Sequence, residues 1–168
     1  MDAHDKTKRV VCLAAVGSLV LLFAAACTKR HGTWTQVELN DLGTRYAAAW
    51  SSQDPQKFAA LYTRKGSLSV NEGPPAVGRE AVAAKAKAFM DAFPDMVVKM
   101  DSMERTGDVI RFHWTWTGTN TGPGGNGRHV KISGYEDWTL GPAGRIRESR
   151  GHYDEAEFQR QMGGDAGN

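Results

Sequence analysis

The sequence contains almost no cysteine. Of its 168 residues only Cys12 and Cys27 are cysteines, and both precede residue 28. No disulfide can therefore cross-link the remainder of the chain. A folded unit of roughly 130 residues buries enough apolar surface to be stable without one. We therefore expect one domain, held together by its hydrophobic core.

The chain also lacks an excess of charge of one sign. Its 21 Lys and Arg and 19 Asp and Glu leave a formal net charge of +2, with basic residues scattered among acidic ones. Binding to a phosphate backbone needs a basic face, so we expect no nucleic-acid partner. Apolar residues at 40% and charged residues at 24% exclude a disordered chain and a multi-pass membrane protein.

Metal and cofactor motifs are missing as well. The glycine-rich segment 118–127 precedes no helical pattern, so it is not a phosphate loop. There is no nucleophile elbow and no dinucleotide fingerprint. We expect neither a cofactor nor a metal, because paired metal-ligand spacing is absent among the five histidines, which are His4, His31, His113, His129 and His152.

A long apolar run occurs at the N-terminus. Basic residues within positions 6–9 precede an uncharged run at 10–26, which is typical of a signal peptide. The run is short for a membrane span and ends in small residues before Cys27, so we expect cleavage there. The predicted organisation is a signal peptide with a possible lipobox at 1–27, a tether at 28–34, a folded domain at 35–163 and a disordered tail at 164–168.

The segment Phe23-Ala24-Ala25-Ala26-Cys27 resembles a bacterial lipobox, in which the cysteine is lipidated. Ala24 stands where leucine is usual, and the three alanines also satisfy the ordinary Ala-x-Ala cleavage signal. A lipid anchor at Cys27, a soluble periplasmic form and an uncleaved anchor therefore remain open. In each case we expect an exported protein of the cell envelope.

Between residue 35 and Pro94 the apolar residues recur at helical spacing. A capping box at 35–38 opens a first helix, and Asp54-Pro55 opens a second that extends to Tyr62. A third helix runs from about Arg79 to Pro94. Its predicted buried face includes Val82, Ala86, Phe89, Met90 and Phe93.

After Pro94 the apolar period changes to two, which indicates strands. The clearest alternation is Ile110, Phe112, Trp114 and Trp116. Three helices followed by consecutive strands predict an α+β fold: a cone-shaped half-barrel in which the N-terminal helices pack on a strongly curved, mainly antiparallel sheet.

Several short motifs occur in an ordered set. They are Gly78-Arg79-Glu80, Phe93-Pro94-Asp95-Met96, Gly107-Asp108, the segment 118–123, Gly144-Arg145-Ile146 and Tyr153-Asp154. In this order the domain resembles the SnoaL-like polyketide cyclase family of the nuclear transport factor 2-like superfamily. The resemblance implies a cone with a buried pocket, a fold used by cyclases, isomerases, hydrolases and binding modules. Such a fold alone does not settle a reaction.

Glu136 is the first candidate for a catalytic base. It shares a predicted strand face with Val130, Ile132, Trp138 and Leu140. A carboxyl group on an apolar face either lines a cavity, where desolvation raises its pKa, or needs a partner. A buried ion pair, or a bulge at Gly134 that turns the side chain outward, remains the alternative.

Further candidates come from the last strand and the second helix. Ile146, Glu148, Arg150 and His152 share a predicted face, so Arg150 would pair with Glu136 and His152 would carry a proton. Tyr62 is either a hydrogen-bond donor to a ligand or a core residue, and His152 is either functional or a surface residue. The predicted pocket wall consists of Trp114, Trp116, Trp138, Arg150 and Phe89.

The resemblance also carries a warning. Catalytic relatives often read Gly-Lys-Ile-Val-Glu-His-Trp-Asp on the last strand, where this chain has residues 144–151, with Ser149 in the histidine position and Gly151 in the aspartate position. We therefore favour a domain that binds a small hydrophobic ligand. A cyclase or isomerase using Glu136, and an interaction module that forms a homodimer through its open sheet face, are the two alternatives.

Overall fold

The computed structural model describes residues 34–164. The predicted signal peptide, the predicted lipid attachment at Cys27 and nearly all of the predicted tether and tail lie outside these residues. The elements in chain order are α1 (Gln36–Ser51), α2 (Pro55–Ala59), β1 (Tyr62–Val70), β2 (Ala76–Val77), α3 (Arg79–Ala92), β3 (Val97–Thr106), β4 (Val109–Thr119), β5 (His129–Leu140), η1 (Pro142–Gly144), β6 (Ile146–Tyr153) and α4 (Glu155–Gln161).

The helices begin where local sequence signals predict. Thr35 caps α1 through a capping box, since its backbone N–H donates to a Glu38 carboxylate oxygen at 2.8 Å while its Oγ1 accepts from the Glu38 N–H at 3.3 Å. The Asp54 side chain caps α2 by accepting hydrogen bonds from the backbone N–H groups of Gln56 and Lys57. The second helix is shorter than we expected: α2 ends at Ala59, and Tyr62 is the first residue of β1.

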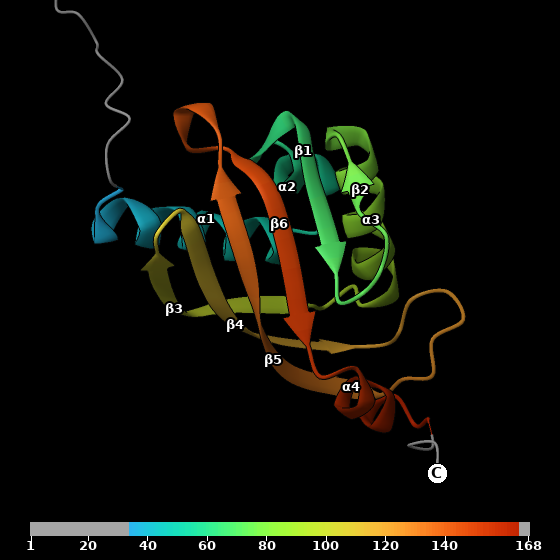
Figure 1. Cartoon of the computed structure of the whole chain (residues 1–168). Helices are drawn as coiled ribbons and strands as arrows, with labels where there is room; N and C mark the ends of the chain where they lie inside the picture. The colour runs from blue at the N-terminus through green and yellow to red at the C-terminus, as the bar shows by residue number, and fades with distance from the viewer. Residues whose placement is uncertain (1–33, 165–168) are drawn as a thin grey trace, which may run out of the picture. The chain divides into compact units, whose positions relative to one another are not determined.

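Six strands form one mixed sheet in the order β2, β1, β6, β5, β4, β3. Strands β3, β4, β5 and β6 follow one another as an antiparallel meander, whereas β1 pairs in parallel with β6. Figure 1 shows α1, α2 and α3 behind this curved sheet and α4 at the end of β6. The sheet does not close on itself, since β2 and β3 are its edges. The predicted α+β class, with helices on a curved and mainly antiparallel sheet, is confirmed.

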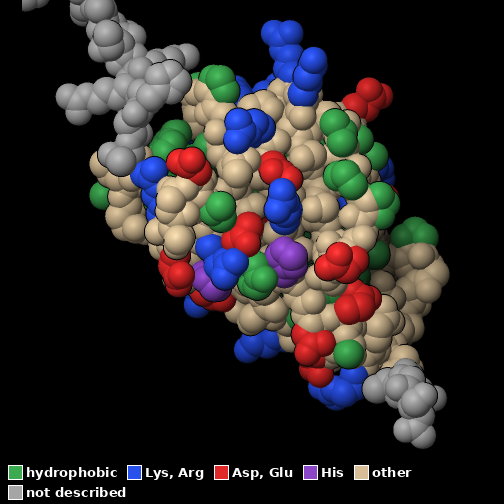
Figure 2. Space-filling model, in the orientation of Figure 1, with side chains coloured by type: hydrophobic (Ala, Val, Ile, Leu, Met, Phe, Trp, Pro, Cys, Tyr) green, Lys and Arg blue, Asp and Glu red, His purple; other side chains and the backbone are tan. Residues whose placement is uncertain are grey.

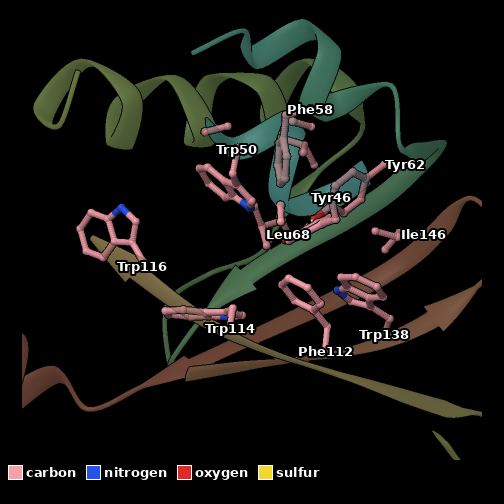
Figure 3. Packing of buried hydrophobic residues seen from close by; sticks show 14 of the residues in the cluster. Tyr46, Trp50, Phe58, Tyr62, Leu68, Phe112, Trp114, Trp116, Trp138 and Ile146 are labelled. Carbon is pink, nitrogen blue, oxygen red and sulfur yellow. Dashed lines mark hydrogen bonds between the residues drawn. The ribbon is translucent and has the colours of Figure 1, made fainter. Parts of the chain in front are cut away.

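The core lies between the helices and the inner face of the sheet. Period-2 alternation puts Phe112, Trp114 and Trp116 of β4 on this face, and the pattern on β5 does the same for Ile132 and Trp138. Aromatic rings fill much of the interior, as Figure 3 shows. Within the described part of the chain, no helix combines the length and apolar character that a membrane crossing requires.

The face predicted for β6 is wrong over most of the strand. Leu140 pairs with Ile146 and Thr139 pairs with Glu148, so Arg147 is an extra residue without a partner on β5. A bulge of one residue moves every later side chain to the opposite face. Ile146 is therefore buried as expected, but Ser149 and Gly151 follow it inward while Arg150 is exposed.

Candidate functional site

A cavity of about 60 Å³ lies between the helices and the inner face of the sheet. Figure 3 shows Trp50 on the helix side of this region and Trp114 and Trp116 on the strand side. Its wall is almost entirely apolar and rich in aromatic rings. The lining residues are Tyr46, Trp50, Val70, Phe89, Met96, Val98, Trp114, Trp116, Ile132, Glu136, Gly151 and Tyr153.

Glu136 is the acidic residue in this wall. Its position on the alternating strand β5 puts its side chain on the inner face, where it is only 5% exposed. Gly151 is its cross-strand partner on β6. A Cβ atom at Gly151 would lie 2.8 Å from Oε1 of Glu136, so the missing side chain leaves the space that the carboxyl group occupies. The predicted inward placement of Glu136 is confirmed.

Three hydroxyl groups surround this carboxyl group. The Ser149 hydroxyl donates to Oε2 of Glu136. The hydroxyls of Tyr46 on α1 and Tyr62 on β1 lie 3.3 Å apart and form a hydrogen bond, and both side chains are buried. Tyr46 also lines the cavity. The three hydroxyl groups come from β6, β1 and α1, and they lie next to the cavity wall.

Burial raises the pKa of Glu136 to about 8. The hydroxyls of Ser149 and Tyr46 stabilise the ionised carboxylate and oppose this shift, but the loss of hydration is the larger effect. The same burial raises the pKa values of Tyr46 and Tyr62 well above their ordinary value, so both phenols stay protonated at neutral pH. A carboxyl group with a pKa near neutrality can both donate and accept a proton.

Glu136 has no basic partner among the described residues. The ion pairs in this part of the chain join other carboxylates to Lys, Arg or His, and none includes Glu136. The neighbouring Asp137 points to the outer face, where Arg111 binds it through two hydrogen bonds of 2.7 and 2.8 Å. The alternative of a buried ion pair at Glu136 is therefore excluded within residues 34–164, and Oε2 is satisfied by Ser149 instead.

Three predicted pocket residues lie in the cavity wall, namely Phe89 on α3 and Trp114 and Trp116 on β4. Trp138 does not belong to this group. It is fully buried beside the cavity, stacked on Phe112 with ring centroids 5.0 Å apart. Tyr62 is also fully buried and does not line the cavity. Its hydroxyl contacts the cavity wall only indirectly, by a hydrogen bond with the hydroxyl of Tyr46.

Arg150 and His152 lie on the outer face of the sheet, contrary to our prediction. Arg150 donates to Glu148 at 2.8 and 2.9 Å and does not pair with Glu136. The His152 ring stacks on Tyr135 with centroids 4.8 Å apart. The bulge at Arg147 is the physical reason, since it reverses the side-chain direction for the rest of β6. Figure 2 shows this face, where charged side chains of both signs and histidine are intermingled.

Sequence reasoning did not predict the other residues of the site, which are Tyr46, Trp50, Val70, Met96, Val98, Ile132, Ser149, Gly151 and Tyr153. Tyr46 and Trp50 lie at helical spacing in the first helix, and this spacing does not distinguish a cavity wall from a filled core. For Ser149 and Gly151 the only signal was their departure from the last-strand pattern of the resembling family. Strand register makes Gly151 the partner of Glu136, and the sequence alone does not show this pairing.

The described residues hold no cluster of three or more His, Cys, Asp or Glu side chains arranged to bind a metal ion. Within residues 34–164, the polar groups at the cavity are thus hydroxyls, indole N–H groups and one carboxyl group. These groups can hydrogen-bond a ligand or move a proton.

Solved structures share this fold. A SnoaL-like polyketide cyclase from a Jannaschia species has 19% sequence identity and a TM-score of 0.67, with 78% of this chain and 97% of that chain covered. A Catenulispora acidiphila protein with a ketosteroid isomerase-like fold, solved in complex with trimethylamine, has 21% identity and a TM-score of 0.64, with 75% and 95% covered.

A third structure, a phenazine biosynthesis-related protein from Pseudomonas aeruginosa, has 15% identity and a TM-score of 0.64, with 79% of this chain and 92% of that chain covered. At these identities the likeness concerns the fold alone. No curated protein matches the sequence. The model of the SnoaL-like polyketide cyclase family matches residues 40–162, which is most of the chain, and the chain therefore belongs to that family.

Proposed function

We propose that this domain binds a small, mainly apolar molecule in the cavity beside Glu136. The observation that carries the proposal is an aromatic-walled cavity with one buried carboxyl group that has no ion-pair partner among residues 34–164. Apolar walls with a few placed polar groups are the usual composition of small-molecule sites. At about 60 Å³ the cavity is far below the roughly 300–1,000 Å³ of drug-sized pockets, so it suits a ligand of few atoms.

The proposal agrees with the likeness to known proteins. The chain belongs to a family described by its cyclase activity, and one protein of the same fold was solved with the small molecule trimethylamine. Export of the domain, with a lipid anchor at Cys27, is part of the proposal and is supported by the sequence of residues 1–27. A ligand would then be met outside the cytoplasm.

A second candidate function is proton transfer within a bound ligand, as in a cyclase or isomerase. It is favoured by one observation: burial raises the pKa of Glu136 to about 8, which suits a general acid or base at neutral pH. Tyr46 would donate a hydrogen bond to a ligand oxygen, with Tyr62 behind it holding the Tyr46 hydroxyl. His152 has no part in this mechanism, because it lies on the outer face.

Binding is tested with a pair of adjacent valines on β3. Val98 lines the cavity, whereas Val97 is 52% exposed. The probe is 3,3-dimethylbutan-1-ol, a small neutral molecule, and the readout is its effect on the tryptophan indole N–H signals in NMR spectra. We expect saturable shifts in the unmodified domain, none with Val98→Phe, which fills the cavity, and normal shifts with Val97→Phe. Equal shifts in both variants would place binding outside the cavity.

A further inference from the structure

The cavity combines aromatic rings on several sides with one carboxyl group. The rings belong to Tyr46, Trp50, Phe89, Trp114, Trp116 and Tyr153. From this arrangement we propose that the cavity selects a small alkylammonium cation, with the Glu136 carboxylate as its counter-ion. The inference rests on the proposed binding function and specifies the class of ligand.

The aromatic part of the wall provides the first argument. Trp50 on α1 lies across the cavity region from Trp114 and Trp116 on β4 (Figure 3). Phe89 on α3 also lines the cavity, so a ligand between the layers meets rings on both sides. Trp50 and Phe89 themselves meet edge to face, with centroids 6.0 Å apart. Aromatic faces attract cations through their quadrupole, most strongly when water is excluded, and cages of this kind hold alkylated ammonium groups.

The charge balance provides the second argument. Buried carboxylates in proteins are normally paired with a cation. Glu136 is 95% buried, since only 5% of it is exposed, and the described residues provide no Lys, Arg or His partner. Ser149 occupies Oε2, whereas Oε1 lies beside Gly151 in the cavity wall. A bound ammonium group would supply the positive charge that the ionised form of Glu136 lacks.

The other side chains of the cavity wall favour an organic cation over a metal ion. Hard metal cations require about six oxygen ligands. Of the residues that the structure describes, only Tyr46, Glu136 and Tyr153 contribute side-chain oxygens to the wall, and Met96, Val98 and Ile132 are apolar. Methyl or methylene groups on the cation would contact these apolar side chains, which a hydrated metal ion would not. The small volume further favours a compact cation such as a trimethylammonium group.

In the described part of the chain, few titratable groups face Glu136. They are Tyr46 from α1 and Tyr62 from β1, whose raised pKa values keep them neutral at neutral pH, while β6 presents Ser149 and Gly151. Asp137 raises the pKa of Glu136 slightly from the outer face. Cation binding must therefore release the proton that Glu136 holds below about pH 8.

The test compares choline with 3,3-dimethylbutan-1-ol, in which a neutral tert-butyl group replaces the trimethylammonium group at nearly the same size. Isothermal titration calorimetry of the domain near pH 8 should show choline binding about tenfold or more tightly than the alcohol. Choline affinity should rise about tenfold per pH unit below pH 8, with proton release, whereas alcohol affinity should not.

Two variants complete the experiment. Glu136→Gln keeps the side-chain size and should abolish the preference for choline while still binding the alcohol. Glu148→Gln removes a carboxylate from the outer face, where it pairs with Arg150, and should leave the preference intact. Equal affinity for both probes in the unmodified domain would overturn the cation proposal and leave the proposed binding function standing. Failure of both probes to bind would overturn both.

Discussion

The carboxyl group of Glu136 fills the space directly over Gly151, its partner on the neighbouring strand. The carboxyl group of Glu136 thus occupies the place on the inner face of the sheet where a side chain at position 151 would lie. Because Gly151 on β6 has no side chain, the carboxyl group that Glu136 extends from β5 fits at this point of the cavity wall.

This packing predicts a strong coupling between positions 136 and 151. Gly151→Ala brings a Cβ atom to within 2.8 Å of Oε1, so the carboxyl group must move, and we expect the free energy of unfolding to fall by about 1–3 kcal/mol. In a Glu136→Ala background the same substitution should cost much less. Urea denaturation of the four proteins measures the coupling energy, and additive losses would show that the two side chains do not compete for space.

The raised pKa of Glu136 predicts that the domain loses stability as pH rises. Below its ordinary pKa of 4.5, both the folded and the unfolded carboxyl groups are protonated. Between 4.5 and about 8 only the folded state keeps the proton, so the free energy of unfolding falls by at most about 1.4 kcal/mol per pH unit. Above about pH 8 this contribution is constant.

Denaturation at several pH values, in the unmodified domain and in Glu136→Gln, isolates this contribution. The difference in the free energy of unfolding between the two proteins should change between about pH 5 and 8 and stay constant above that range. A difference independent of pH would mean that Glu136 titrates normally.

Ser149 should tune the proton affinity of Glu136. Its hydroxyl donates to Oε2 and favours the ionised carboxylate, so Ser149→Ala should raise the pKa of Glu136 further above its present value of about 8. Carbon-13 NMR titration of the Glu136 carboxyl carbon measures the shift directly. Ser133→Ala is the matched control, because Ser133 bonds Thr115 on the outer face. An unchanged pKa in Ser149→Ala would refute this role.

The N-terminal prediction is tested in the full chain by cell fractionation. If Cys27 carries the lipid, the Cys27→Ala protein should lack both the lipid and the mass that it adds to the mature chain. The Cys12→Ala protein should keep both. Mass spectrometry of the membrane fraction distinguishes lipidation from simple cleavage or an uncleaved anchor. Lipid-free protein from both variants and from the unmodified chain would count against the lipobox.

Much of the fold was predictable from local patterns. The capping box at Thr35, the Asp54 cap and the alternation along β4 each depend on neighbours within a few residues, and each is present in the structure. The inward direction of Glu136 was predictable for the same reason, since period-2 alternation along β5 continues through it. Tyr62 shows the opposite case, because helical spacing from Phe58 extended the second helix past its real end.

The composition of the site depended on contacts between distant segments. Whether Ser149 or Arg150 faces Glu136 is decided by the unpaired Arg147, and that bulge exists because of how β6 aligns with β5. Tyr46 meets Tyr62 through the packing of α1 against the sheet, across a separation that no local period records. Periodicity assigns a side chain to a face within its own strand or helix, whereas strand register and helix packing choose its partners.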